Sequence, residues 1–316
     1  MNFLFSKKLN LSECLKRFFA KAEADAILAS KTIQKYKEVA GMLIRTLGDI
    51  NIKKINEMTV IELKQKLNQR NLSASRKNHF LVVLKSILIQ CEKEGIKVFD
   101  PIKVTKFTVP QKEVSYLTKE QLITLASAPS NKTITGLRMR AVIQTAISTG
   151  CRVSELLGLN KSQIDFETSS VVSIRTKGNR PHQIIFNPAS QMAIQEYLEI
   201  RGDDNCDALF ATINANNIGR LQVNDLQRGL RNLGKKLGFK INVTPHLIAR
   251  RSVATLMFKE GVPLGVIQKF LNHSSSQVTT KFYIGNLDFE EVKKHHKAIM
   301  DFNVDFNTGK EMDNRT

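Results

Sequence analysis

The sequence predicts a mainly α-helical protein with a small antiparallel sheet, arranged as two domains. Three observations support this prediction. Apolar residues recur at helical spacing from Leu11 to about Lys97, and helical periodicity resumes after a lapse between Asp100 and Ser115. One stretch, 171–186, instead contains two β-rich runs around a polar turn. With 316 residues, 42% of them hydrophobic, the chain can bury a core and is nearer in length to two domains than to one.

Residues 1–100 are expected to form a small domain of four or five helices. Ser30, Thr59 and either Ser73 or Ser75 occupy positions suited to helix N-caps, and Gly95 follows the last helix as a stop. The apolar positions that define the helices are Leu15, Phe18, Phe19, Tyr36, Val39, Ala40, Leu43, Leu81, Val82, Leu84, Ile87 and Leu88.

Residues 101–115, rich in lysine and valine and containing two prolines, are predicted to form an extended basic linker. The second domain, 116–285, begins with a capping box between Thr118 and Gln121 and a helix from about 136 to 148. After the hairpin, Asn187 and Thr244 are suited to cap further helices. The expected helices are 188–200, 223–237, 245–259, 263–271 and about 275–282, and residues 286–316 form a tail.

The charge of the chain indicates a polyanionic partner. Lys and Arg number 48 against 29 Asp and Glu, a net charge of +19, which suits nucleic acid better than an anionic membrane surface. Residues 1–110 carry +11, residues 111–285 carry +10 and residues 286–316 carry −2. There is no run of about eighteen apolar residues, and the start MNFLFSKKLN lacks the pattern of an export signal, so a cytoplasmic protein without a membrane partner is expected.

The cysteines do not indicate a disulfide framework or a zinc site. The four of them are scattered, without a CxxC pair or clustered histidines, and buried or half-buried free thiols are expected. The sequence also lacks a phosphate-binding Walker loop and a carboxylate metal cluster. No cofactor and no metal are therefore predicted.

The segment ISTGCRVSELLGL, residues 147–159, contains the first candidate for phosphate chemistry. Arg152 follows a glycine that lets the backbone bend, and Glu155 is placed to hold the helix or the guanidinium. A surface Arg–Glu helical pair is the alternative interpretation. The segment resembles the first arginine motif of the tyrosine recombinase family, which includes phage integrases and Xer proteins.

The segment TPHLIARRSVAT, residues 244–255, is similar to the family's stretch in which a histidine precedes an arginine by three positions. Here His246 precedes Arg250 by four, and on an α-helix either spacing keeps the two side chains on one face. Arg250 is therefore predicted to be the second catalytic arginine. Arg251 would point away and serve as a DNA-backbone or structural residue. Histidine and arginines that merely line a basic helix are the alternative.

The segment LNHSSSQVTTKFY, residues 271–283, resembles the family's last motif, in which a histidine precedes the tyrosine nucleophile by nine or ten residues. His273 and Tyr283 match it, and Asn272 stands where a glycine is most often found. The family also carries a lysine on a hairpin between its two arginine motifs. Lys177 matches that position, with Arg180 as a competitor for a phosphate contact.

The resemblance implies a helical core-binding domain followed by a mixed α/β catalytic domain that cuts and rejoins DNA through a 3′-phosphotyrosine. Tyr283 would attack the phosphorus, Arg152 and Arg250 would hold its oxygens, and Lys177 would protonate the leaving 5′ oxygen. His246 is then the candidate for taking the tyrosine proton and His273 for a further phosphate hydrogen bond.

The resemblance also implies four protomers acting on paired double-stranded DNA sites, without ATP or metal. The segment 288–300, with Phe289, Val292, Ile299 and Met300, is expected to dock on a neighbouring subunit or to pack on its own domain. The short stretch before Leu11 leaves no space for an arm-binding domain, which fits a Xer-like resolvase or a simple mobile-element integrase. A type IB topoisomerase and a non-catalytic DNA-binding protein of the same fold are the alternatives. The target site, direction and accessory partners are not indicated by the sequence.

Overall fold

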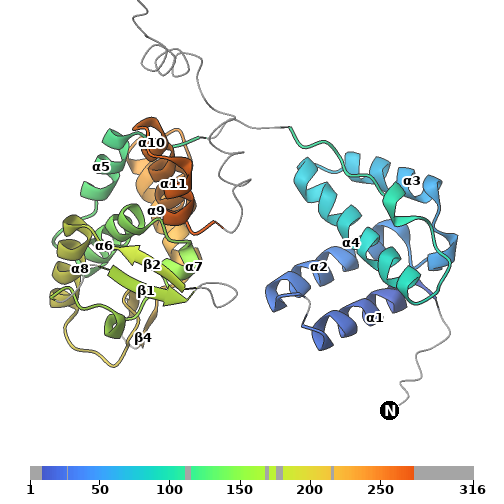
Figure 1. The fold of residues 1–316 in the computed structure, drawn as a ribbon, viewed down its shortest axis with the longest axis horizontal. Helices are drawn as coiled ribbons and strands as arrows, with labels where there is room; N and C mark the ends of the chain where they lie inside the picture. Colours follow the sequence, from blue (N-terminus) through green and yellow to red (C-terminus); the bar gives the residue numbers. More distant parts are fainter. Residues whose placement is uncertain are drawn as a thin grey trace, which may run out of the picture. The chain divides into compact units, whose positions relative to one another are not determined.

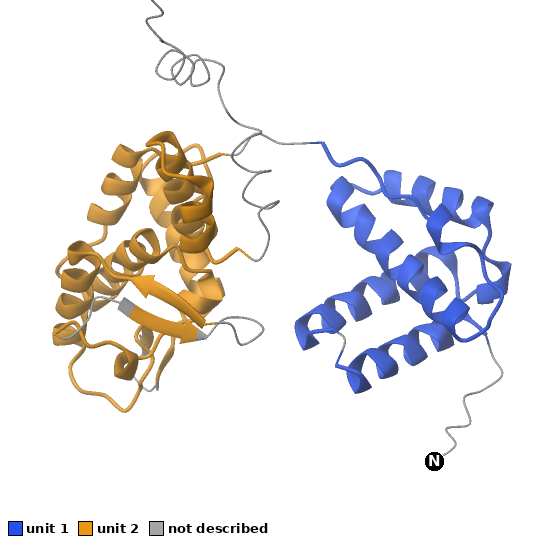
Figure 2. Cartoon of the chain, viewed as in Figure 1, with its two compact units in different colours: residues 1–112 blue, residues 113–316 orange. Residues whose placement is uncertain are grey.

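The protein was analysed as a computed structural model, which describes residues 9–26, 28–110, 115–167, 171–175, 181–214 and 217–273. The chain divides into two compact units, unit 1 with residues 1–112 and unit 2 with residues 113–316 (Figure 2). No helix in the described part of the chain combines the length and apolar character needed to cross a membrane. The prediction of a mainly helical fold with little sheet is confirmed (Figure 1).

The described residues of unit 1 form four α-helices around one apolar core. They are α1 (Leu11–Ala24), α2 (Ser30–Leu47), α3 (Glu57–Asn68) and α4 (Ala74–Lys93), with short 3₁₀ turns at Ile52–Lys54 and Pro101–Lys103. Helix α4 is the central element and carries the fully buried Phe80, Leu84 and Ile87. It packs against α1 and α2, so three amphipathic helices bury their apolar faces against one another.

The ends of these helices agree in part with the predicted caps. Ser73 caps α4 by accepting a hydrogen bond from the Arg76 N–H at 3.2 Å, and Gly95 beyond its end has φ +75°. Thr59 is not an N-cap, because Asn56 caps α3 and Thr59 is its reciprocal partner three residues later. Ser30 is the first residue of α2 rather than its N-cap, which is Ala29.

The first part of the predicted linker packs on unit 1. Val104 is 3% exposed, and the side chain of Asn78 exchanges two hydrogen bonds with the backbone of Phe107, at 2.7 and 2.9 Å. Lys64 and Lys77 each lie 5.6 Å from the Phe107 ring. Residues 101–107 are therefore held against α3 and α4.

In the described residues of unit 2, helices pack together with two short β-hairpins (Figure 1). Its helices are α5 (Lys119–Ser127), α6 (Ile134–Thr149), α7 (Val153–Leu156), α8 (Pro188–Arg201), α9 (Val223–Lys236), α10 (Val253–Lys259) and α11 (Leu264–Phe270). Helix α6 packs against α8 and supplies the centre of the core. The predicted caps Thr118, Asn187 and Thr244 each accept a hydrogen bond from a backbone N–H three residues later.

The predicted hairpin is confirmed as β1 (Val171–Arg175) paired antiparallel with β2 (Pro181–Ile185), in a register that places Ile174 opposite His182. A second hairpin, β3 (Ala211–Asn214) with β4 (Asn217–Arg220), also lies between the two arginine motifs in sequence. The sequence interpretation recognised only the first, because β3 and β4 are four residues each and too short for a clear alternation of apolar and polar residues.

The expected helix 245–259 is interrupted. Residues Leu247–Ser252 form a π-helical turn that continues into α10. The hydroxyl of Ser252 donates to the Leu247 carbonyl at 2.8 Å and accepts the Leu117 N–H at 2.8 Å, so it stabilises the wide turn and joins it to the start of the unit. This turn contains Arg250 of the second arginine motif and begins directly after His246.

Candidate active site

The first arginine motif lies where α6 ends and α7 begins. Gly150 has φ +61°, the left-handed conformation that favours glycine, and a Cβ there would lie 2.5 Å from Cε1 of Phe270. The backbone turns at this point so that Arg152 becomes the N-cap of α7. The site therefore depends on a residue without a side chain at position 150.

Replacing Gly150 with alanine is expected to lower the free energy of unfolding by about 2–5 kcal/mol. The left-handed conformation costs a residue with a Cβ about 1–2 kcal/mol, and the overlap with Phe270 adds about 1–3 kcal/mol. Gly238→Ala is the matched control, because Gly238 also ends a helix with a positive φ, +71°, but has nothing within 4 Å of its Cβ position. Urea unfolding of the two variants separates the contributions, and equal destabilisation would contradict the Phe270 contact.

Glu155 holds both the backbone and the guanidinium of Arg152. Its carboxylate accepts the Arg152 backbone N–H at 2.9 Å and Nη1 at 2.9 Å. The Glu155 side chain is 7% exposed, whereas that of Arg152 is 41% exposed. An isolated surface pair does not describe this arrangement, because Nη2 of Arg152 also donates to the Asn272 carbonyl at 3.1 Å, 120 residues along the chain.

Arg250 points from the π-helical turn towards the same place. It is 4% exposed, and it donates to the Gly150 carbonyl and to the Leu271 carbonyl, each at 2.8 Å. The extra residue between His246 and Arg250 is therefore accommodated by the wider turn rather than by a rotation along an α-helix. Arg251 instead lines a pocket with Lys240, Thr244 and His246.

The end of α11 is where the two arginines meet. Three consecutive carbonyls, those of residues 270, 271 and 272, lie against His182 Nε2 at 3.3 Å, Arg250 Nη2 and Arg152 Nη2. Cations are favoured at a helix C-terminus because its last carbonyls carry partial negative charge. This end of the helix thus gathers the two guanidinium groups beside His273.

Asn272 and His273 end the helix in a Schellman motif. The backbone N–H of His273 donates to the Gln268 carbonyl and that of Asn272 to the Lys269 carbonyl. Asn272 has φ +47°, a left-handed conformation that asparagine tolerates better than most residues other than glycine. Asparagine in place of the usual glycine therefore still ends the helix and directs the chain into His273.

His273 lines a pocket of about 600 Å³ between the β1–β2 hairpin and α11. Burial, and then the charges of Arg250 and Arg152, lower its pKa to about 4. The pKa of His246 is lowered by burial of the ring and then by Arg251, Arg250 and Arg152. Both histidines are thus neutral at pH 7 beside guanidinium groups, in a site suited to an anion.

Acidification is expected to destabilise the protein as the pH falls from about 6.5 to about 4. In the unfolded chain His273 has its ordinary pKa, so the unfolded state takes up a proton first and the free energy of unfolding falls with pH. After allowance for partial exposure, the contribution of His273 is on the order of 1 kcal/mol. Urea midpoints of wild type and His273→Gln at pH 7, 6 and 5 test this, and equal pH slopes in both would contradict it.

Several predicted residues lie outside the described part of the chain. Lys177, Arg180, Tyr283 and the tail 286–316 are among them, and the Arg175 side chain is not described. The structure brings together Arg152, Glu155, Arg250 and His273, with His246 close enough to be influenced by both arginines. The strands that flank residue 177 are paired, with Arg175 opposite Pro181.

The sequence interpretation did not single out His182 or Cys151. His182 is 6% exposed on β2, and Cys151 is 2% exposed next to Arg152. A signal for His182 was present, since Ile184 and Phe186 follow it at alternate positions and indicate the buried face of the strand. The prediction that the cysteines are buried or half-buried free thiols is confirmed.

Comparison with known proteins gives a consistent result. Residues 115–289 match the phage integrase family. The chain is 30% identical over 202 residues to tyrosine recombinase XerC of Chlamydia trachomatis serovar L2, a match that covers 63% of this chain and 64% of that protein, slightly less than two thirds of its length.

Solved structures show the same fold at lower identity. The Tn1549 transposon integrase in complex with transposon right-end DNA is 18% identical with a TM-score of 0.71, over 90% of this chain and 99% of that one. A lambda integrase tetramer bound to a Holliday junction is 17% identical with a TM-score of 0.70, over 88% and 78% of the two chains. Because the family match extends over more than half of the sequence and includes all three motifs, the chain belongs to the phage integrase family, whose members are tyrosine recombinases.

Proposed function

We propose that this protein is a site-specific DNA recombinase that cuts and rejoins double-stranded DNA through a 3′-phosphotyrosine bond. The observation that carries the proposal is the convergence of Arg152 and Arg250 on consecutive carbonyls that lead directly into His273. A phosphodiester in transfer needs positive charge on its non-bridging oxygens, and two guanidinium groups supply it. Membership of an enzyme family with this chemistry supports the same conclusion.

Arg152 is the better exposed of the two arginines. Its hydrogen bonds to Glu155 and Asn272 use two of the five N–H donors of the guanidinium and leave others for a phosphate. Arg250 is buried and supplies the second positive charge. We assign His273 a hydrogen bond to the phosphate and His246 the proton of the nucleophile.

The nucleophile is assigned to Tyr283, one of four tyrosines in the chain. Tyr197 is fully buried and its hydroxyl accepts the Ala211 N–H at 3.2 Å. Tyr36 belongs to α2 of unit 1, and the Tyr116 ring lies 5.4 Å from Lys259, in a groove that neither Arg152 nor Arg250 lines. Tyr283 follows His273 by ten residues, as the family motif requires.

In the proposed reaction the Tyr283 oxygen attacks phosphorus and the bond to the 5′ oxygen breaks. Lys177, between the paired strands β1 and β2, would supply the proton to that oxygen. The 5′-hydroxyl of another strand then attacks the phosphotyrosine, releases the tyrosine and completes the exchange. This sequence conserves the phosphodiester energy, so it needs neither ATP nor a metal ion.

We further propose that four protomers act on paired sites and that residues 288–300 of one protomer dock on the next. An apolar groove on unit 2, lined by Ile123, Ile147, Leu256 and Met257, offers a surface for them. Leu122, Ala126, Val253 and Val262 complete its apolar lining. The segment carries the apolar Phe289, Val292, Ile299 and Met300. The tetrameric lambda integrase, which has the same fold, supports the stoichiometry.

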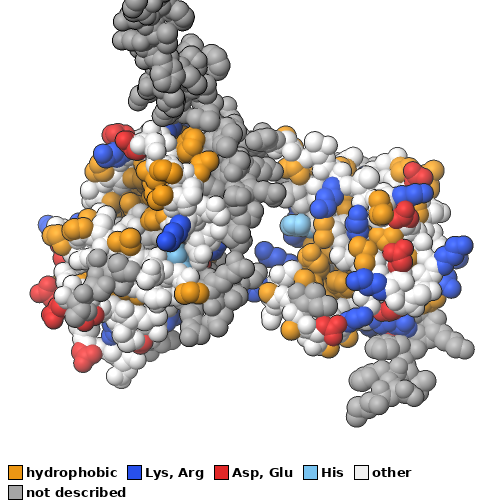
Figure 3. Space-filling model, in the orientation of Figure 1, with side chains coloured by type: hydrophobic (Ala, Val, Ile, Leu, Met, Phe, Trp, Pro, Cys, Tyr) orange, Lys and Arg blue, Asp and Glu red, His pale blue; other side chains and the backbone are white. Residues whose placement is uncertain are grey.

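DNA affinity is expected to fall about 10³-fold or more between 50 and 200 mM salt, as for proteins that make six to ten phosphate contacts. The net charge of +19 and the Lys and Arg side chains on the visible face of each unit support this (Figure 3). Fluorescence anisotropy with a labelled duplex in EDTA measures the slope. An affinity that barely changes with salt would exclude binding dominated by the phosphate backbone.

The function is tested by trapping covalent adducts on DNA fragments from the source genome in EDTA. Detergent-resistant protein–DNA complexes are expected, and sequencing the trapped DNA should identify one preferred site. Adducts accompanied by relaxation of supercoiled plasmids without paired sites would instead favour a type IB topoisomerase. Tight binding with no adduct on any fragment would indicate a non-catalytic DNA-binding protein and would contradict the proposed function.

A further inference from the structure

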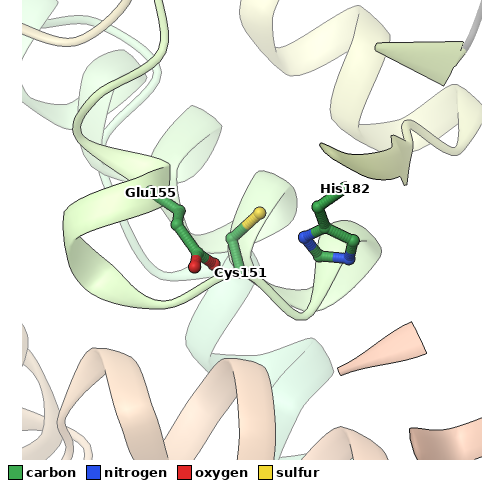
Figure 4. Close-up of side chains that lie close together, drawn as sticks. All are labelled: Cys151, Glu155 and His182. Carbon is green, nitrogen blue, oxygen red and sulfur yellow. The ribbon is translucent and has the colours of Figure 1, made fainter. Parts of the chain in front are cut away.

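Three side chains next to the candidate active site form a separate cluster. Cys151 follows the end of α6, Glu155 lies on α7 and His182 on β2 (Figure 4). One ligand atom from each lies within 4.8 Å of the others, and this is the only such group among the residues that the structure describes. Cys151 and His182 are buried residues, 2% and 6% exposed, and the Glu155 side chain is 7% exposed.

His182 has the hydrogen bonding of a metal-binding histidine. Its Nε2 lies 3.3 Å from the Phe270 carbonyl, which only accepts, so the proton belongs on Nε2 and Nδ1 carries a lone pair. Nδ1 is buried and has no hydrogen-bond partner. Figure 4 shows one ring nitrogen of His182 facing Cys151. A histidine that binds a metal through one nitrogen typically donates its other N–H to a carbonyl or carboxylate.

We propose that Cys151, Glu155 and His182 form a binding site for a divalent cation of the zinc class, and that an ion there inhibits the recombinase by competing with Arg152 for Glu155. Thiolate, imidazole and carboxylate together are donors that zinc and cobalt accept in tetrahedral sites, with water as the fourth ligand. The inhibitory part rests on the proposed function, whereas the binding part does not.

Local chemistry permits the ion to bind despite the neighbouring arginines. Burial raises the pKa of the Cys151 thiol to about 12, so the free protein carries a thiol there and the metal must displace its proton to solvent. The resulting thiolate and the Glu155 carboxylate neutralise the two charges of the ion. The ligand atoms need to approach to about 3.5 Å from one another, a side-chain movement of about 1 Å.

A pocket lies next to the cluster on the side of His182, and an ion would enter from it once a movement of the ring exposes the buried Nδ1. This residue lines the pocket of about 600 Å³ that His273 also lines, between the hairpin and α11. An ion that reaches Nδ1 from there meets the carboxylate that holds Arg152 through its backbone N–H and Nη1. Taking a carboxylate oxygen from Arg152 releases the guanidinium from the geometry that phosphate binding needs.

The binding part is tested without DNA by titrating the full chain, with its thiols reduced, with Co²⁺. One equivalent is expected to produce the near-ultraviolet thiolate-to-cobalt absorption and tetrahedral visible bands, and Zn²⁺ should displace both. Cys151→Ala should lose the absorption, and His182→Gln should weaken Co²⁺ binding at least tenfold. Cys206→Ala, which alters a half-buried cysteine elsewhere in unit 2, should bind as wild type does. Circular dichroism confirms that each variant folds.

The inhibitory part is tested by measuring covalent adduct formation in EDTA and in buffered Zn²⁺. Zn²⁺ should reduce the wild-type rate at least tenfold and leave that of Cys151→Ala unchanged. Undiminished Co²⁺ absorption in folded Cys151→Ala would overturn the site, and wild-type adduct formation that ignores bound Zn²⁺ would overturn the inhibition. A chain that binds Co²⁺ but forms no adduct even in EDTA would refute the proposed function while supporting the metal site.

Discussion

Replacing Tyr283 with phenylalanine is expected to abolish the covalent protein–DNA adduct and to leave DNA affinity unchanged. The substitution removes only the hydroxyl oxygen that would bond to phosphorus, and no other group in the proposed site replaces it. Detergent-resistant complexes should fall to background on DNA that carries the trapped site. Anisotropy measurements with the same DNA should give the wild-type affinity, because phosphate contacts from lysine and arginine dominate binding.

Tyr116→Phe is the matched control, since it removes a tyrosine hydroxyl from the same unit in a groove that neither Arg152 nor Arg250 lines. It should form adducts at the wild-type rate. Adducts that persist in Tyr283→Phe and disappear in Tyr116→Phe would reassign the nucleophile. Persistence in both variants would exclude either of these tyrosines as the source of the covalent bond.

Replacing Arg152 with alanine is expected to slow cleavage about 10³-fold or more, within the range typical of arginines that stabilise phosphoryl transfer. The variant loses the exposed guanidinium, and it also leaves the buried Glu155 carboxylate without that partner. Arg152→Lys should recover little, because an ammonium cannot contact Glu155, the Asn272 carbonyl and a phosphate in the same planar arrangement. Single-turnover adduct formation measures the rate.

Arg228→Ala provides the control for an arginine in an ordinary helical pair. Arg228 bonds Asp225 at 2.9 Å with the same three-residue spacing, but both side chains are well exposed. Arg228→Ala should cleave at the wild-type rate. Its free energy of unfolding should differ from that of wild type by no more than about 1 kcal/mol. Wild-type cleavage by Arg152→Ala would place Arg152 in the same class as Arg228 and remove it from the mechanism.

Local rules predicted most of the helices because their signals lie within a few residues of one another. Thr118 with Gln121 and Asn187 with Pro188 combine a cap with a first-turn residue, and both helices begin where expected. The prediction of Thr59 as an N-cap is wrong because Asn56 and Thr59 are both good cap residues. The capping box uses Asn56 as the N-cap and Thr59 as the third residue of the helix. Spacing alone does not say which of the two begins the helix.

The remaining features depend on contacts between distant segments. The second hairpin consists of two paired strands of four residues each. Strands this short show no clear periodicity in the sequence. Cys151 and His182 lie 31 positions apart and come together only through the packing of β2 beside α6. The same is true of the carbonyls at the end of α11, which Arg152 and Arg250 approach from more than twenty residues away in sequence.

The π-helical turn has a consequence for how such enzymes are recognised and altered. A pattern search that demands two intervening residues between the histidine and the arginine would reject this chain, although its Arg250 still reaches the Gly150 and Leu271 carbonyls. The inserted residue is absorbed within six positions, and α10 beyond it continues undisturbed. In this chain the motif therefore accommodates one more residue without a compensating deletion, and the hydroxyl of Ser252 occupies the widened turn.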